Sequence, residues 1–191
     1  MINEEKALLR ATSLRDFFIA RDASEMADAY QSLIKSVKTA APIPADWKDI
    51  EFAFNRLFVG PNSLPSPPFA SVYIDSEPQI MSPSTIRIRQ IYGMLGLTSP
   101  YEGSLPDDHL SLELDASIHF KTALNRNDSA ELRGLWRYFL VDHLGLWIPQ
   151  FVNRVLSTKG VPQAILFAVN QLKDWLKEEI SAVPTVEQVN L

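Results

Sequence analysis

The sequence has no cysteine among its 191 residues. A chain without thiols cannot form a disulfide scaffold, a thiolate zinc site, a cysteine nucleophile or a cysteine-ligated iron–sulfur cluster. Long hydrophobic runs are also absent. The longest uninterrupted apolar stretch is six residues, Ala164 to Val169, whereas a membrane span needs about 20. We therefore expect no membrane insertion.

Positive charge is scarce as well. Lysine and arginine number 18 against 23 acidic residues, which gives a net charge of −5. The basic residues form no cluster, and because phosphate neutralisation supplies most nucleic-acid affinity, we expect no nucleic-acid partner. The N-terminus, Met-Ile-Asn-Glu-Glu-Lys, is acidic where a secretion signal is cationic. This predicts a chain that begins near residue 1 and a cytoplasmic localisation.

Common catalytic motifs are missing. The sequence has no Gly-x-Gly-x-x-Gly, no Gly-Lys-Ser/Thr phosphate loop, no His-Glu-x-x-His and no Gly-x-Ser-x-Gly. His109 lies four residues before Glu113, and Asp115 lies four before His119, so each pair can share a helical face. The two pairs point apart, because residue 115 is about 240° around a helix from residue 109. A metal site is therefore a weaker interpretation than surface or structural histidines.

The prolines divide the chain. Ten of the 13 lie between Pro42 and Pro106, so the middle is loop-rich while both flanks are free to form helices. Val72-Tyr73-Ile74 has a strand-like composition but is too short to build a sheet. Apolar residues elsewhere recur at helical spacing. We expect one all-α globular domain over residues 1–191, with about eight to ten helices and an irregular proline-rich connection at residues 60–70.

Capping residues predict where these helices begin and end. Gly60-Pro61, Gly96 and Gly145 are the expected stops, with Gly96 in the left-handed conformation. A capping box, formed by Ser104 and Asp107, is expected to open a long helix through Leu110. The other expected starts are Ser24, Asp46, Ser84, Asp128 or Ser129, Pro149 and Pro162.

Residues 90–120 contain no lysine or arginine but five acids: Glu102, Asp107, Asp108, Glu113 and Asp115. This distribution predicts a locally acidic surface. One interpretation is a solvated helix face whose acids interact favourably with the helix N-terminus. The other is a surface that receives a cationic partner.

Several segments together resemble the TorD/DmsD family of cytoplasmic chaperones for molybdenum-dependent redox enzymes. The resemblance spans roughly residues 50–150 in the order and spacing of the family. A weaker resemblance to the family follows at His143-Leu-Gly-Leu-Trp147-Ile-Pro149. The main segments are Phe54-Asn-Arg-Leu-Phe-Val-Gly-Pro61, Pro67-Pro68, Ser71-Val-Tyr-Ile-Asp-Ser-Glu77, Ser84-Thr-Ile-Arg-Ile-Arg-Gln90, Gly96-Leu97 and Pro106-Asp-Asp-His-Leu110.

The resemblance implies an all-helical, non-catalytic protein without a cofactor of its own. Its implied partners are the twin-arginine signal peptide and the catalytic subunit of a molybdenum-dependent oxidoreductase, held until the cofactor is inserted and the enzyme is exported. Carried over residue by residue, the implied peptide-binding residues are Tyr73, Asp75, Glu77, Arg89, Asp108 and His109. Some close relatives have tryptophan where this chain has Tyr73, so the subfamily and the client stay open.

The residues themselves suit that role, because a cationic leader with an apolar stretch needs carboxylates beside an apolar groove. Asp107 joins Asp75, Glu77 and Asp108 as a candidate carboxylate. The expected groove lining is Tyr73, Leu105, Leu110, Tyr92 and Phe69.

Structural roles remain open for the same residues. Tyr73 can be a core residue, Asp75 a cap, Arg89 half of an internal ion pair, Asp108 a helix-start acid and His109 a hydrogen-bond partner of a loop. Two other functions remain as alternatives. One is a metal-dependent helical hydrolase that uses His109, Glu113 and His119. The other is a nitrate-reductase-type assembly factor that binds the catalytic subunit without reading a leader.

Overall fold

The computed structural model describes residues 2–61, 63–77, 82–98 and 104–184. Within these ranges the chain forms nine α-helices and two π-helical segments, and no strand. The predicted all-α class is therefore confirmed, and the helix number falls within the expected range. The α-helices are α1 (Ile2–Ile19), α2 (Ala23–Ser36), α3 (Trp47–Phe54), α4 (Ser71–Ile74), α5 (Pro83–Met94), α6 (Leu110–Arg126), α7 (Ala130–Arg137), α8 (Gly145–Ser157) and α9 (Gln163–Ala182). The π-helical segments are η1 (Asn55–Val59) and η2 (Tyr138–Leu144).

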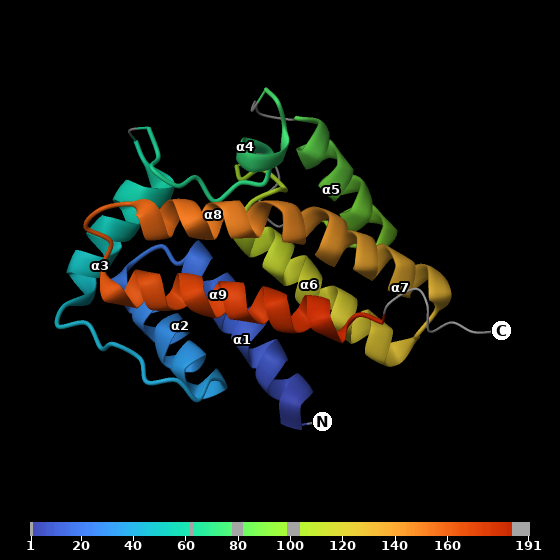
Figure 1. Cartoon of the computed structure of the whole chain (residues 1–191), viewed down its shortest axis with the longest axis horizontal. Helices are drawn as coiled ribbons and strands as arrows, with labels where there is room; N and C mark the ends of the chain where they lie inside the picture. The colour runs from blue at the N-terminus through green and yellow to red at the C-terminus, as the bar shows by residue number, and fades with distance from the viewer. Residues whose placement is uncertain (1, 62, 78–81, 99–103, 185–191) are drawn as a thin grey trace.

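Helix α1 is central to the packing, because it contacts α2, α6 and α9. Helices α8 and α9 lie side by side, with α3 at one end of the molecule, α7 at the other, and α4 and α5 along the upper edge in the view of Figure 1. Aromatic rings fill the space between these elements. Phe18 contacts both Phe54 and Phe151, so the α1, α3 and α8 helices share one apolar core.

Several predicted helix ends are confirmed. Asp46 caps α3 by accepting a hydrogen bond from the Lys48 N–H at 2.8 Å, and Ser129 caps α7. Gly60 follows η1 with a φ of 107°, and Gly96 follows α5 with a φ of 70°. Only glycine adopts such backbone angles readily, which explains why both helical segments stop there.

Other predicted ends are wrong, and most differ by a few residues. Asp22 rather than Ser24 caps α2, and Ser82 rather than Ser84 caps α5. The long helix α6 begins at Leu110, with His109 as its cap, and not at Ser104. In each case more than one short polar side chain was available, and local spacing does not decide between them.

Two predicted elements differ in kind. The strand-like segment Val72-Tyr73-Ile74 belongs to the short helix α4, because a composition rich in β-branched residues is only a weak preference. Gly145 does not end a helix. It has helical angles, φ −61° and ψ −24°, so η2 runs directly into α8. Pro149 consequently lies inside α8. No helix in the described part of the chain is long and apolar enough to cross a membrane.

Candidate functional site

The segments before α4 and α6 are joined by their backbones. Ala70 N–H donates to the carbonyl of Asp108 at 3.0 Å, and Leu110 N–H donates to the carbonyl of Pro68 at 2.9 Å. Phe69 and His109 form the isolated antiparallel bridge between these bonds. The two motifs that resemble the family on either side of α5 are therefore held against each other.

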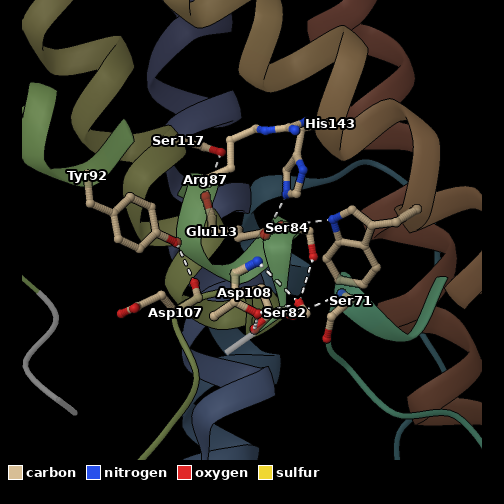
Figure 2. Close-up of polar contacts among 12 residues, drawn as sticks. Ser71, Ser82, Ser84, Arg87, Tyr92, Asp107, Asp108, Glu113, Ser117 and His143 are labelled. Atoms are coloured by element: carbon tan, nitrogen blue, oxygen red, sulfur yellow. Dashed lines mark hydrogen bonds and ion pairs between the residues drawn. The ribbon is translucent and has the colours of Figure 1, made fainter. Parts of the chain in front are cut away.

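The Asp108 side chain reinforces this junction. One carboxylate oxygen accepts the Ser71 N–H at 2.9 Å, and the other accepts the Thr85 hydroxyl at 3.1 Å (Figure 2). Asp108 is only 1% exposed. A buried carboxylate with two donors from separate helices connects α4 and α5 to the start of α6.

His109 caps α6 from a buried position. Its Nδ1 accepts the Ser111 N–H at 3.2 Å and lies 2.7 Å from the Ser111 hydroxyl. The ring also packs edge-on against Phe69. Burial lowers the pKa of His109 to about 4. The imidazole is therefore neutral at physiological pH and acts as an acceptor in this cap.

Asp107 pairs with the helix that precedes it. Arg89 Nε donates to the Asp107 carboxylate at 2.6 Å, and Tyr92 donates its hydroxyl hydrogen to the Asp107 carbonyl at 2.8 Å (Figure 2). The Asp107 side chain is 5% exposed, whereas that of Arg89 is 48% exposed. Arg89 thus forms the internal ion pair while still reaching the surface.

A second buried acid joins α6 to η2 and α8. Glu113 is fully buried, with one oxygen 2.6 Å from His143 Nε2 and the other accepting the Trp147 Nε1–H at 2.8 Å (Figure 2). Burial raises the pKa of Glu113, while His143 and Trp147 oppose that shift. The His143 and Trp147 contacts were missed by sequence reasoning, since no local pattern links residues 30 and 34 positions away.

Tyr73 lies between this buried layer and the surface. Its ring stacks on Trp147 with centroids 5.9 Å apart, and its hydroxyl donates to the Pro67 carbonyl at 2.9 Å. The Arg154 guanidinium lies 6.0 Å from the ring centroid. Burial raises the pKa of Tyr73 to about 12, although Arg154 opposes the shift. Tyr73 is therefore half-buried and neutral.

Asp75 and Glu77 are the outermost of the predicted site residues. Asp75 accepts the Ser84 hydroxyl at 2.6 Å, at the first turn of α5. Burial favours a higher pKa for Asp75, but hydrogen bonds from Ser82 and Ser84 and the nearby Arg87 bring it below its ordinary value. Glu77 is exposed. These two carboxylates are the ones that a cationic peptide could reach without disturbing the core.

The prediction that residues 90–120 form an acidic surface is wrong for most of the five acids in this segment. Asp107, Asp108 and Glu113 are buried, because each satisfies donors on another element. Asp115 is partly buried and accepts from Arg15 at 2.6 Å. Glu102 lies outside the described residues.

The expected groove lining also needs correction. Leu110 is 0% exposed and Tyr92 is 5% exposed, so both belong to the core. Tyr73, Leu105 and Phe69 keep intermediate exposure and remain candidates for the surface of the site.

The residues of the alternative metal site, taken one by one, contact different side chains. His109 contacts Ser111, and Glu113 contacts His143. His119 lies 3.6 Å from Asp115. Among the residues that the structure describes, no group of three or more histidine or acidic side chains is close enough to hold a metal ion.

The model of the nitrate reductase delta subunit family matches residues 19–153 of this chain. This range is most of the chain. The chain belongs to this family. The resemblance to TorD/DmsD proteins that the motifs indicated is thereby confirmed.

Curated relatives of this nitrate reductase delta subunit family member include two types of chaperone. A Tat proofreading chaperone, DmsD from Salmonella typhi, is 26% identical over 160 residues, which covers 76% of this chain and 75% of the relative. The chaperone protein TorD from a Psychrobacter species is 24% identical over 175 residues, covering 90% of this chain and 78% of the relative.

A solved structure agrees on the fold. The crystal structure of a redox enzyme maturation protein from Archaeoglobus fulgidus superposes with a TM-score of 0.58 and 17% identity. The alignment covers 88% of this chain and 93% of that protein. At this identity the likeness establishes a common fold for the two chains.

Proposed function

We propose that this protein is a cytoplasmic chaperone that matures a redox enzyme and recognises its twin-arginine leader. The named relatives are chaperones of the DmsD and TorD type, which supports a non-catalytic role in redox enzyme maturation. The client is proposed to be a molybdenum-dependent oxidoreductase. The chaperone would hold the immature enzyme until its cofactor is inserted and export begins.

One observation carries the proposal. The two motifs that resemble the leader-binding segments of the family, Ser71–Glu77 and Pro106–Leu110, are in contact although the residues that meet, Ser71 and Asp108, are 37 positions apart. The buried members, Asp108 and His109, keep the site in shape. The outer members supply the negative charge and the aromatic surface that a peptide with cationic and apolar parts requires.

The proposed division of labour assigns direct contact to Tyr73, Asp75, Glu77 and Arg89. Asp75 and Glu77 would face the arginine pair of the leader. Arg89 is half-exposed and bound to Asp107, so its free guanidinium N–H groups could donate to carbonyl oxygens of the leader while the ion pair holds the side chain in place. Asp107, Asp108 and His109 then act by positioning these groups rather than by touching the peptide.

Calorimetry with a synthetic twin-arginine leader tests this function. The affinity should fall when both arginines become glutamine and should fall again with added salt, because exposed charges are screened. Glu77→Gln should weaken binding several-fold without changing the unfolding midpoint. Asp174→Asn, at another exposed acid on α9, is the matched control. Equal affinity for the two peptides would refute recognition of the arginine pair.

A second candidate is an assembly factor that binds the body of the catalytic subunit and not its leader. The description of the matching family, nitrate reductase delta subunit, favours keeping this alternative. Co-purification with a client that lacks its leader separates the two. Retention of a leaderless client together with no affinity for the leader peptide would favour the assembly factor.

A further inference from the structure

An apolar groove runs between α8 and α9, the two helices that lie side by side in Figure 1. It has a volume of about 590 Å³. Among its apolar lining residues, Ile148, Val152 and Leu176 are buried, whereas Pro149 is exposed and Ile180 is half-buried. Apolar side chains on both helices are therefore accessible to a partner along this groove.

The apolar side of α8 continues past the groove. Pro149, Val152 and Leu156 are three and four residues apart, so they lie along one side of the helix. Leu156 is 41% exposed. The seven positions from Pro149 to Leu156 span roughly 10 Å, or about two helical turns. An amphipathic helix presents its own apolar residues at the same spacing, so it can pack as a third helix against the α8 and α9 pair.

Two lysines give this groove a positive charge. Lys173 and Lys177 are exposed lining residues on α9, and because they are four positions apart they are neighbours on its surface. Within the described part of the chain neither forms an ion pair, and the described lining includes no acid. Glu178, the next residue along α9, pairs with Arg10 of α1 at 3.0 Å. In a chain of net charge −5, such a groove favours an anionic partner.

Helix α8 separates the groove from the proposed leader site. Gln150 Nε2 donates to the Tyr73 carbonyl at 3.4 Å, and the Arg154 guanidinium lies 6.0 Å from the centroid of the Tyr73 ring. Pro149 and Val152 line the groove instead. The two surfaces use different sides of one helix, so a partner in the groove leaves Tyr73 accessible.

We infer that the groove between α8 and α9 is a second protein-binding site, which receives an acidic amphipathic helix of a protein partner. The apolar residues of that helix pack on Pro149, Leu156 and Ile180. Acidic residues one turn apart on its flank meet Lys173 and Lys177, because they repeat the spacing of the two lysines. The inference goes beyond the proposed function, since these lysines repel a cationic leader.

A synthetic helical peptide is the probe. It carries leucines at positions i, i+3, i+4 and i+7, glutamates on both flanks of the leucines, and alanine elsewhere. We call it the glutamate peptide. A second peptide has every glutamate replaced by lysine, and a third has every leucine replaced by serine. Calorimetry measures the binding of each peptide to the native chain and to Lys173→Glu/Lys177→Glu, the groove variant.

The groove variant should bind the glutamate peptide roughly tenfold more weakly than the native chain does, because two attractive charge pairs become repulsive. It should bind the lysine peptide more tightly than the native chain does, since the charges are then complementary again. The serine peptide should bind neither protein, because the apolar contacts are lost.

Lys35→Glu/Lys38→Glu is the matched control variant. Lys35 and Lys38 are exposed and do not line the groove, and their replacement changes the net charge by the same amount. At an ionic strength of about 0.15 M distant charges are screened, so the control variant should bind the glutamate peptide like the native chain. All four changes are at exposed positions, and unfolding midpoints verify that both variants fold.

Several outcomes would overturn the inference. One is a native chain that does not bind the glutamate peptide, and another is equal affinity of that peptide for the groove and control variants. A dimer in sedimentation that only the groove variant disrupts would assign the groove to a second copy of this chain. Binding that appears only after truncation at Pro184 would assign it to the residues that follow.

Leader titration keeps this test separate from the proposed function. The groove and control variants should bind a synthetic twin-arginine leader alike, because the leader site is on another side of α8. If the native chain binds no leader but binds the glutamate peptide through Lys173 and Lys177, leader recognition is overturned and the groove assignment stands.

Discussion

The carboxylate of Glu113 lies 2.6 Å from Nε2 of His143, and both side chains are buried. The pair connects the first turn of α6 to the π-helical segment η2. The wider turn of η2 leads into α8, where Trp147 donates to the same carboxylate. One acid therefore fixes the relative position of three helical segments beneath Tyr73.

Replacing Glu113 by alanine should strongly destabilise the fold. Two buried donors, on His143 and Trp147, lose their acceptor, and breaking a buried pair in this way costs about 3 to 5 kcal/mol. Urea unfolding followed by circular dichroism measures the loss. Asp142→Ala, at an exposed position of the same segment, should unfold at the native midpoint. An unchanged midpoint for Glu113→Ala would contradict the linking role.

Asp108→Ala should reduce stability together with leader affinity. The substitution leaves the Ser71 N–H and the Thr85 hydroxyl unsatisfied inside the protein, at a cost of about 1 to 3 kcal/mol. Because Asp108 is buried, we expect stability and leader affinity to fall together. Denaturant midpoints and peptide titration on the same variant compare them. If Asp108→Ala unfolds at the native midpoint but has lost its affinity for the leader, Asp108 contacts the leader directly.

His109 should make the fold sensitive to acid. Burial lowers its pKa from an ordinary 6.5 to about 4, so the folded state favours the neutral ring. The resulting stabilisation is complete above pH 6.5 and is lost as the pH falls from 6.5 through about 4. Integrated over that window, the effect is about 3 kcal/mol.

His109→Asn keeps a capping side chain but removes this titration. We expect the stability of the native chain to fall more steeply than that of the variant between pH 6.5 and about 4. Urea midpoints measured across this range for both proteins test the difference, since other groups titrate equally in each. Parallel curves would show that His109 is not held neutral by the fold.

Arg87→Gln should tighten leader binding. Burial favours a higher pKa for Asp75, hydrogen bonds from Ser82 and Ser84 bring it below its ordinary value, and the Arg87 guanidinium adds to this lowering, so Arg87 already interacts with the carboxylate that we assign to the leader. Removing it frees that carboxylate for an arginine of the peptide, with an expected gain of about threefold, within the range of an exposed ion pair. Calorimetry at low salt measures the gain. Weaker binding of Arg87→Gln to the native leader would indicate that Arg87 itself contacts the peptide.

The helical character of the chain could be predicted from local sequence. Apolar spacing, the caps at Asp46 and Ser129 and the stop at Gly96 each depend on residues a few positions apart. Such signals act within a helix and its first neighbours, so these three did not depend on distant parts of the chain. The motifs carried the family resemblance for the same reason, because they are read along the chain.

The assembled site depended on contacts between distant parts of the chain. The acids at Asp107, Asp108 and Glu113 give the same sequence signal as a solvated surface, yet their donors come from α4, α5, η2 and α8. Residue spacing predicts which side of a helix a carboxylate occupies, but not whether another helix brings a donor to that side. Local spacing and motifs were enough to predict the helices and the family of this protein. Tertiary packing decided which acids are buried and which remain free to meet a partner, because burial depends on elements that are remote along the chain.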